Sequence, residues 1–150
     1  MSDRQAPPFQ PKWILQFQVF LLRHRLMGPM NKQFMVITTT GRKSGHSHSV
    51  PIGFAPDGKG YIAFNLGRGS NWYRNVLANP RVILEINGRS FEACGEPLTA
   101  PEQIHQALVA HQREVPAVYK NYLRVAVDAP QEDIVKLGER IGFVRFDPLA

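Results

Sequence analysis

The sequence has few of the residues that build crosslinks or metal sites. It holds one cysteine, Cys94, so no disulfide can form within the chain. Neither a Cys-x-x-Cys nor a His-x-x-x-His pair is present, which argues against a structural zinc site. A lone thiol fits a reducing compartment.

Long apolar runs are also scarce. The densest apolar stretch, residues 13–22, is too short to cross a bilayer, which needs roughly 20 residues, and cationic residues 23–25 follow it at once. Asp3 and three prolines precede it, which is not the layout of a signal peptide. We therefore expect a cytoplasmic protein. Its segment 13–25 is predicted to be a helix that packs on the core, supports a homodimer interface, or makes a peripheral membrane contact.

Three further patterns are missing. No repeat or low-complexity tract occurs in the 150 residues, so we expect an arm over residues 1–11 and a single domain over 12–150. No Gly-x-Gly-x-x-Gly follows a strand, which argues against a dinucleotide-binding βαβ fold. Ser44 has no evident His/Asp partner set, which argues against a hydrolase.

Basic residues outnumber acidic residues in the sequence. Lys and Arg number 18 against 12 Asp and Glu, which gives a formal net charge of +6 and favours an anionic partner. The basic residues are scattered, and no stacking motif of aromatic strands accompanies them, so we do not expect nucleic-acid binding.

Hydrophobic periodicity predicts a mainly β, α+β domain of about six antiparallel strands, a small barrel with peripheral helices. A capping box is predicted at Thr99–Ala–Pro–Glu102. The expected strands cover 34–40, 48–55, 61–66, 81–87, 89–96 and 143–146; the expected helices cover 13–25, 71–78, 99–115, 117–127 and 131–141. The third strand is expected to return antiparallel to the second.

The loop at residues 41–47 joins the first two predicted strands. It combines Gly41 and Gly45 with the cations Arg42 and Lys43 and the hydroxyl of Ser44. Glycine permits conformations that aim successive N–H groups at an anion, and the cations add full positive charge. The same residues also make an ordinary solvated turn, so the loop alone leaves both interpretations open. His46 and His48 flank it, either as solvated turn residues or as added charge at lower pH.

Three motifs carry a resemblance to a known family. They are residues 38–45 (Thr-Thr-Thr-Gly-Arg-Lys-Ser-Gly), 50–53 (Val-Pro-Ile-Gly) and 71–82 (Asn-Trp-Tyr-Arg-Asn-Val-Leu-Ala-Asn-Pro-Arg-Val). In this order they resemble the deazaflavin-dependent nitroreductase family, over about residues 34–89. The resemblance implies a split β-barrel related to flavin-binding oxidases of pyridoxamine phosphate, and coenzyme F420 as cofactor.

The resemblance also implies a set of site residues. Arg42, Lys43 and Ser44 would hold the phosphate and acidic tail of the coenzyme. Residues 65–70 match a further cofactor-lining loop that is shorter here, and Trp72 and Tyr73 would lie beside the cleft or in the core. The cofactor-binding residues expected on this basis are Thr40, Gly41, Arg42, Lys43, Ser44, Gly45, Pro51, Asn65, Arg68, Trp72, Tyr73 and Asn75. Arg68 and Arg74 would widen the cationic groove.

The implied activity is hydride transfer from reduced coenzyme F420 to an electron-poor acceptor, such as a nitroaromatic, a quinone or an enone. Tyr119 and Tyr122 resemble a tyrosine cluster that closes over the substrate, so either is a candidate proton donor, or else a packing residue. Two alternatives stay open: an FMN-dependent reductase on the same fold, and a non-catalytic carrier of an anionic amphiphile. His105 and His111 receive no role.

Overall fold

The computed structural model describes residues 11–66 and 70–149 of the chain. Most of the predicted arm and Arg68, one of the expected cofactor residues, therefore lie outside the described residues. The strands are β1 (Phe34–Thr40), β2 (Ser47–Gly53), β3 (Ala55–Asp57), β4 (Gly60–Leu66), β5 (Arg81–Ile86), β6 (Arg89–Leu98) and β7 (Ile141–Pro148). The helices are α1 (Lys12–Arg23), η1 (Gly28–Lys32), α2 (Asn71–Ala78), α3 (Pro101–Glu114), α4 (Pro116–Val118), η2 (Tyr119–Leu123) and α5 (Gln131–Arg140).

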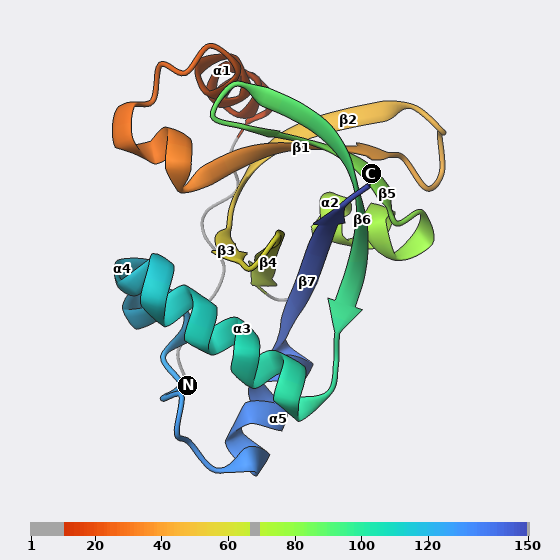
Figure 1. The fold of residues 1–150 in the computed structure, drawn as a ribbon. Helices are drawn as coiled ribbons and strands as arrows, with labels where there is room; N and C mark the ends of the chain where they lie inside the picture. Colours follow the sequence, from red (N-terminus) through yellow and green to blue (C-terminus); the bar gives the residue numbers. More distant parts are fainter. Residues whose placement is uncertain (1–10, 67–69, 150) are drawn as a thin grey trace.

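All seven strands form one antiparallel sheet in the order β2-β1-β5-β6-β7-β4-β3. Its two edges, β2 and β3, are separated along the chain by Phe54 alone. A flat sheet of this order would hold its edges roughly 29 Å apart, at about 4.8 Å per strand. The sheet therefore curls until the edges meet (Figure 1), which confirms the predicted barrel-like α+β architecture.

The second predicted strand, 48–55, is split in the structure. Phe54 turns its ring into the core, where the residue is 4% exposed, and the chain changes edge at this point. The prediction that residues 61–66 return against residues 48–55 is therefore right only for the last residue of that segment. β4 pairs with the short β3 on one side and with β7 on the other, and not with β2. A continuous run of apolar residues does not indicate where the chain passes from one edge of the sheet to the other.

Two clusters of buried side chains lie on opposite faces of the sheet. Neighbours on β4 and β7 alternate between them: Ala63 and Val144 point into the barrel interior, whereas Ile62 and Phe143 face the helices α3 and α5. These strands are buried on both faces, which explains their nearly continuous apolar sequence.

Helix α1 packs against strands β1 and β2 (Figure 1) through Val19 and Leu22, which contact Val36 of β1. Its opposite face is exposed, with Trp13, Phe17 and Phe20 at 70%, 55% and 51% exposure. Within the described residues, no helix combines the length and apolar character that a bilayer-crossing helix requires.

Two helix predictions need correction. The residue that caps the N-terminus of α3 is Gln103, not Glu102. Its side-chain Oε1 accepts hydrogen bonds from the backbone N–H groups of Thr99 and Ala100 at 3.2 and 3.1 Å. The helix expected over 117–127 ends at Leu123, in a π-helical turn, because Arg124 adopts a left-handed conformation with φ +55°.

Candidate functional site

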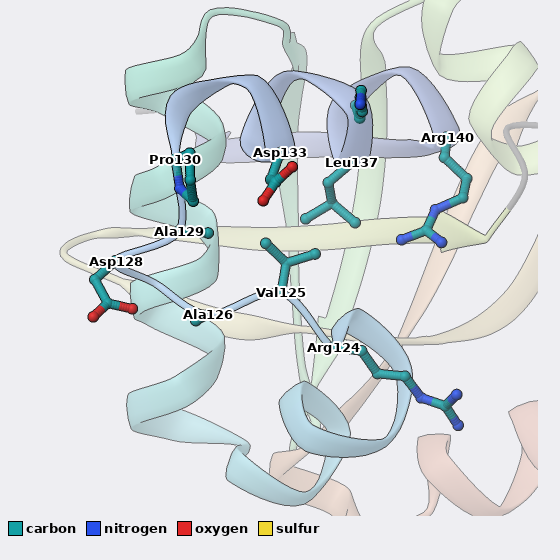
Figure 2. A pocket seen from close by; sticks show the side chains of 10 residues that line it. Arg124, Val125, Ala126, Asp128, Ala129, Pro130, Asp133, Leu137 and Arg140 are labelled. Carbon is teal, nitrogen blue, oxygen red and sulfur yellow. The ribbon is translucent and has the colours of Figure 1, made fainter.

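Three hollows mark the described surface. One lies between the loop after η2 and helix α5, from Arg124 to Arg140, with a volume of about 660 Å³. Figure 2 shows Asp128 at one end and Arg140 at the other, with Asp133 between them. Charges of both signs line it, and none of the predicted site residues does, so we do not place the cofactor there.

The second hollow is a groove of about 730 Å³ beside the predicted anion-binding loop. Helix α1, the end of β1, the start of β2 and the first turns of α2 form its walls. The lining residues are Lys12, Leu15, Gln16, Arg23, Thr39, Gly41, Arg42, Lys43, Ser44, Ser47, His48, Ser49, Val50, Asn71, Trp72 and Asn75. Four of these are lysines or arginines and none is a carboxylate. The donor set therefore suits an anion.

The loop itself is a tight turn closed by the β1–β2 pairing of Thr40 with Ser47. The Gly41 N–H donates to the His46 carbonyl at 2.7 Å, and the Gly45 N–H donates to the Gly41 carbonyl at 2.9 Å. Gly45 takes φ +75°, which favours glycine. A Cβ at Gly41 would lie 2.7 Å from the Ser44 hydroxyl, so a larger residue would displace that side chain.

Asn75 of α2 fixes this loop to the sheet. Its side-chain Oδ1 accepts from the backbone N–H and from Nη1 of Arg42, at 3.2 and 2.8 Å, and its side-chain Nδ2 donates to the Thr39 hydroxyl at 3.0 Å. Asn71 accepts a further bond from Arg42 Nη2 at 3.3 Å. Because Asn75 is 2% exposed and already bonded on both ends, we assign it a positioning role toward Arg42.

The cations of the groove differ in how far they are neutralised. Arg23 forms an ion pair with Glu85 at 2.9 Å and donates to Ser49 Oγ at 3.3 Å. The hydrogen bond that Arg23 donates to the Glu85 carboxylate raises the pKa of Arg23 above its ordinary value. Within the described residues, Lys12, Arg42 and Lys43 have no carboxylate within 4.0 Å. The groove therefore keeps an excess of positive charge.

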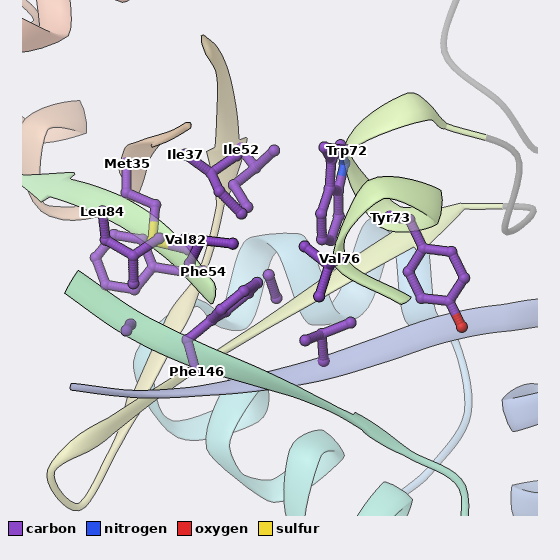
Figure 3. Packing of buried hydrophobic residues seen from close by; sticks show 13 residues of the cluster. Met35, Ile37, Ile52, Phe54, Trp72, Tyr73, Val76, Val82, Leu84 and Phe146 are labelled. Atoms are coloured by element: carbon purple, nitrogen blue, oxygen red, sulfur yellow. The ribbon is translucent and has the colours of Figure 1, made fainter. Parts of the chain in front are cut away.

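The two aromatic residues of α2 lie in different places. Trp72 borders the groove and packs toward Phe146 in the barrel interior, with 6.4 Å between the ring centroids. Tyr73 points to the other side of the helix (Figure 3), where its ring covers Gly142 of β7. A Cβ at Gly142 would lie 2.5 Å from that ring. Trp72 can therefore contact a molecule in the groove, whereas Tyr73 is a core residue.

The third hollow is a cavity of about 300 Å³, mostly apolar, at the junction of β2, β4 and α3. Its lining residues are Gln33, Phe34, Ile52, Gly53, Phe54, Phe64, Asn65, His111, Val115, Val118 and Tyr122. Tyr122, 51% exposed, lies at the rim, whereas His111 is 1% exposed. From here on, the second hollow is called the groove and the third hollow is called the cavity.

The groove and the cavity lie along one face of the same strand. Val50 of β2 lines the groove and Ile52 lines the cavity. Residues two apart on a strand point to the same face and are separated by about 7 Å. The cationic groove and the apolar cavity are thus neighbours along β2.

The predicted site residues separate into several groups. Gly41, Arg42, Lys43, Ser44, Trp72 and Asn75 line the groove. Asn65 and Tyr122 line the cavity. Neither is lined by Thr40, Gly45, Pro51, Tyr73 or Tyr119, nor by Arg74, which is exposed on α2. The Tyr119 hydroxyl donates to the Val125 carbonyl at 2.8 Å, so it supports the turn after η2.

Sequence reasoning missed residues in both places. Lys12, Gln16 and Arg23 of α1 join the groove, as does Thr39. His48, which the sequence placed beside the loop, lines the groove as well. The basic residues at the two ends of α1 were the only sequence feature that indicated a contribution of this helix to the groove. His111 lines the cavity although we assigned it no role, because an isolated histidine at helical spacing resembles any core residue.

Comparison with known proteins adds a family and a fold. The family model described as F420H(2)-dependent quinone reductase matches residues 21–129. Among solved structures, an F420-H2 dependent reductase (FDR-A) superposes with a TM-score of 0.55 at 22% identity, covering 77% of this chain and 94% of that chain.

Two further solved structures share the fold at still lower identity. A domain-swapped dimer gives a TM-score of 0.57 at 20% identity, covering 90% of this chain and 97% of that one. The heme storage protein HutZ from Vibrio cholerae gives 0.56 at 13%, covering 91% of each chain. Because one fold serves both a reductase and a storage protein, the fold alone does not determine the activity.

Proposed function

Since the chain belongs to the F420H(2)-dependent quinone reductase family, we propose that it reduces an electron-poor small molecule, with a quinone as the first candidate, using reduced coenzyme F420. Nitroaromatics and activated enones are the other acceptors of the same chemical class. The family makes it an F420-dependent oxidoreductase. The acceptor is our inference.

The residues of the groove fit the coenzyme that the family implies. The side chains of Arg42, Lys43 and Ser44 would hold its phosphate and acidic tail, because charge-assisted bonds to such oxygens are the strong ones. Lys12 of α1 adds charge from the opposite wall. When bound, the coenzyme supplies a hydride; the protein supplies binding and orientation.

One observation carries this proposal: a cationic groove without a lining carboxylate lies next to an apolar cavity along β2. A molecule with an anionic tail needs the first part, and a flat apolar acceptor needs the second. A carrier of an anionic amphiphile would also suit this shape, so reduction of an acceptor is what separates the two functions.

Tyr122 is our candidate for the proton donor, or for a hydrogen bond to developing negative charge. Its side chain lines the cavity and is half-exposed, so it can exchange protons with water. The hydroxyl of Tyr119 already donates to Val125. We therefore expect Tyr122→Phe to lower turnover; full turnover with every acceptor tested would remove this role.

The test of the function is a pair of titrations followed by a turnover assay. Purified protein is titrated with oxidised coenzyme F420 and, separately, with FMN, and fluorescence reports binding. We expect a response to F420, followed by oxidation of the reduced coenzyme when a naphthoquinone is added. Tight FMN binding without a response to F420 would overturn the cofactor assignment. Binding of F420 without turnover of any acceptor would favour a carrier.

We also propose that the exposed face of α1 makes a contact outside the monomer. Trp13, Phe17 and Phe20 recur at helical spacing on the side opposite Val19 and Leu22. The similar solved structure described as a domain-swapped dimer favours a homodimer. Light scattering of Phe17→Ser/Phe20→Ser against the parent chain tests this, and liposome flotation of both tests the alternative, a membrane surface.

A further inference from the structure

His111, which lines the cavity, has one polar side-chain atom without a hydrogen-bond partner in the described part of the chain. Nε2 of His111 is buried and has no hydrogen-bond partner among the described residues. The ring packs edge-on against Phe64 and Phe143, with centroid separations of 5.3 and 6.3 Å. Buried polar atoms in native proteins are nearly always bonded, so an orphan beside a cavity needs an explanation.

The helix determines which ring nitrogen carries the proton. Nδ1 of His111 lies 2.9 Å from the carbonyl oxygen of Ala107, one turn earlier on α3. A carbonyl oxygen only accepts, so Nδ1 must be the protonated nitrogen that donates to it. In a neutral ring Nε2 then carries a bare lone pair and acts only as an acceptor.

The surroundings keep this ring neutral. Burial among apolar side chains lowers the pKa of His111 below its ordinary value, outweighing the bond to Ala107, which favours the charged form. The other polar residues lining the cavity are Gln33, Asn65 and Tyr122, so no carboxylate among its lining residues could stabilise an imidazolium.

We propose that the cavity binds an apolar ring compound through a hydroxyl group that donates a hydrogen bond to His111 Nε2. The volume, about 300 Å³, is at the small end for ligand sites and suits one or two fused rings. A carbonyl oxygen at the same position would face the Nε2 lone pair and gain no bond. At the position facing His111 Nε2, the cavity therefore selects a hydroxyl over a carbonyl or an ether.

This selectivity deepens the function proposed above, and that extension rests on it. A quinone carries carbonyl oxygens, whereas its two-electron reduced form carries hydroxyls. His111 would then favour the reduced form, so the product should bind more tightly than the oxidised acceptor. The binding preference itself needs neither the coenzyme nor turnover.

A matched pair of probes tests the preference. The full chain, without added coenzyme, is titrated with 2-naphthol and with 2-methoxynaphthalene, in which a methyl group replaces the hydroxyl hydrogen and so removes the donor, and ligand fluorescence is followed. We expect 2-naphthol to bind about three- to tenfold more tightly, the range of one net hydrogen bond. Equal affinity for the two probes, or no binding of either, would overturn the proposal.

Two variants connect the preference to His111. His111→Phe should bind both probes equally, whereas His105→Phe, at an exposed position of the same helix, should keep the preference for 2-naphthol. A preference that persists in His111→Phe would contradict the assignment.

A measurement on the unsubstituted protein covers the case in which His111→Phe fails to fold. The ¹⁵N resonance of His111 Nε2 should move on adding 2-naphthol and stay in place with 2-methoxynaphthalene; no movement with 2-naphthol would overturn the proposal. If the preference is found and F420-dependent turnover is not, the reductase function fails and the hydroxyl site stands. If turnover is found without the preference, the reductase function stands and the hydroxyl site fails.

Discussion

The groove and the cavity recognise their ligands by opposite means, although β2 lines both. The groove gathers exposed or half-exposed cations on a turn held by Asn75, where charge attracts an anion that keeps part of its hydration. The cavity is lined by a neutral imidazole that selects a hydroxyl because its bare Nε2 can only accept a hydrogen bond. Recognition of charge thus tolerates solvent, whereas recognition of a neutral donor requires burial.

The largest effect should come from removing the charge of the groove. Arg42→Ala/Lys43→Ala should weaken binding of oxidised coenzyme F420 about a hundredfold or more, because two charge-assisted contacts are lost at ~1.5–3 kcal/mol each. Affinity for 2-naphthol in the cavity should not change. Fluorescence titrations of both ligands measure this.

Arg74→Ala is the matched control for that prediction. Arg74 is exposed on α2, carries the same charge, and does not line the groove. Its removal should change F420 affinity less than about threefold, the effect of a distant exposed charge. An equal loss in Arg74→Ala and in the double variant would mean that net charge, and not the groove, holds the coenzyme.

The central part of the groove could be predicted from the sequence because it is formed by residues that are close together in the chain. Residues 38–45 fold on themselves, and the alternation of glycines, cations and hydroxyls is a property of one short stretch. What the sequence did not reveal is the wall contributed by α1 and the bond between Asn75 and Arg42, which joins positions 33 residues apart. Such contacts depend on how the sheet curls, and no local pattern encodes them.

Asn75→Ala should show that the turn is held from α2. The substitution leaves Thr39 and the Arg42 guanidinium without their buried partner, which should lower the free energy of unfolding by about 2–3 kcal/mol. F420 affinity should fall as well, since Arg42 is no longer oriented. Urea unfolding measures the stability, and Asn71→Ala, which removes one exposed contact at 3.3 Å, should cost less than ~0.5 kcal/mol. Equal costs for the two variants would contradict the positioning role.

The cavity could not be assembled from sequence. Its lining comes from segments near residues 33, 53, 64, 111 and 122, each an ordinary apolar or turn sequence on its own. His111 lies at the spacing of Ile104 and Leu108, so it looked like one more core position. The tyrosine motif predicted that residues 119 and 122 belong together, yet the π-helical turn sends their side chains to different surroundings.

The two tyrosines should therefore behave differently when each loses its hydroxyl. Tyr119→Phe removes the 2.8 Å bond to the Val125 carbonyl and should lower the free energy of unfolding by about 1 kcal/mol. Tyr122→Phe, at a half-exposed position, should change it by less than ~0.5 kcal/mol and act on turnover instead. Thermal unfolding and steady-state rates of both variants test this. A larger loss of stability in Tyr122→Phe than in Tyr119→Phe would show that the roles are reversed.

The smallest effect should be a pH dependence of stability that comes from His111. In the unfolded chain this imidazole titrates near its ordinary pKa of 6.5, whereas burial lowers its pKa in the folded protein. As the pH falls below 6.5, His111 is therefore protonated in the unfolded state but not in the folded state. The free energy of unfolding declines until the pH reaches the lowered pKa of His111 in the folded protein. At about pH 7 both states are mainly neutral and the contribution vanishes. His111→Phe should lose less stability than the parent between about pH 7 and pH 5, while His105→Phe should follow the parent. If urea unfolding gives parallel pH profiles for the parent and His111→Phe, the buried imidazole is protonated as readily as an exposed one, and the neutral acceptor on which the cavity's selectivity depends does not exist.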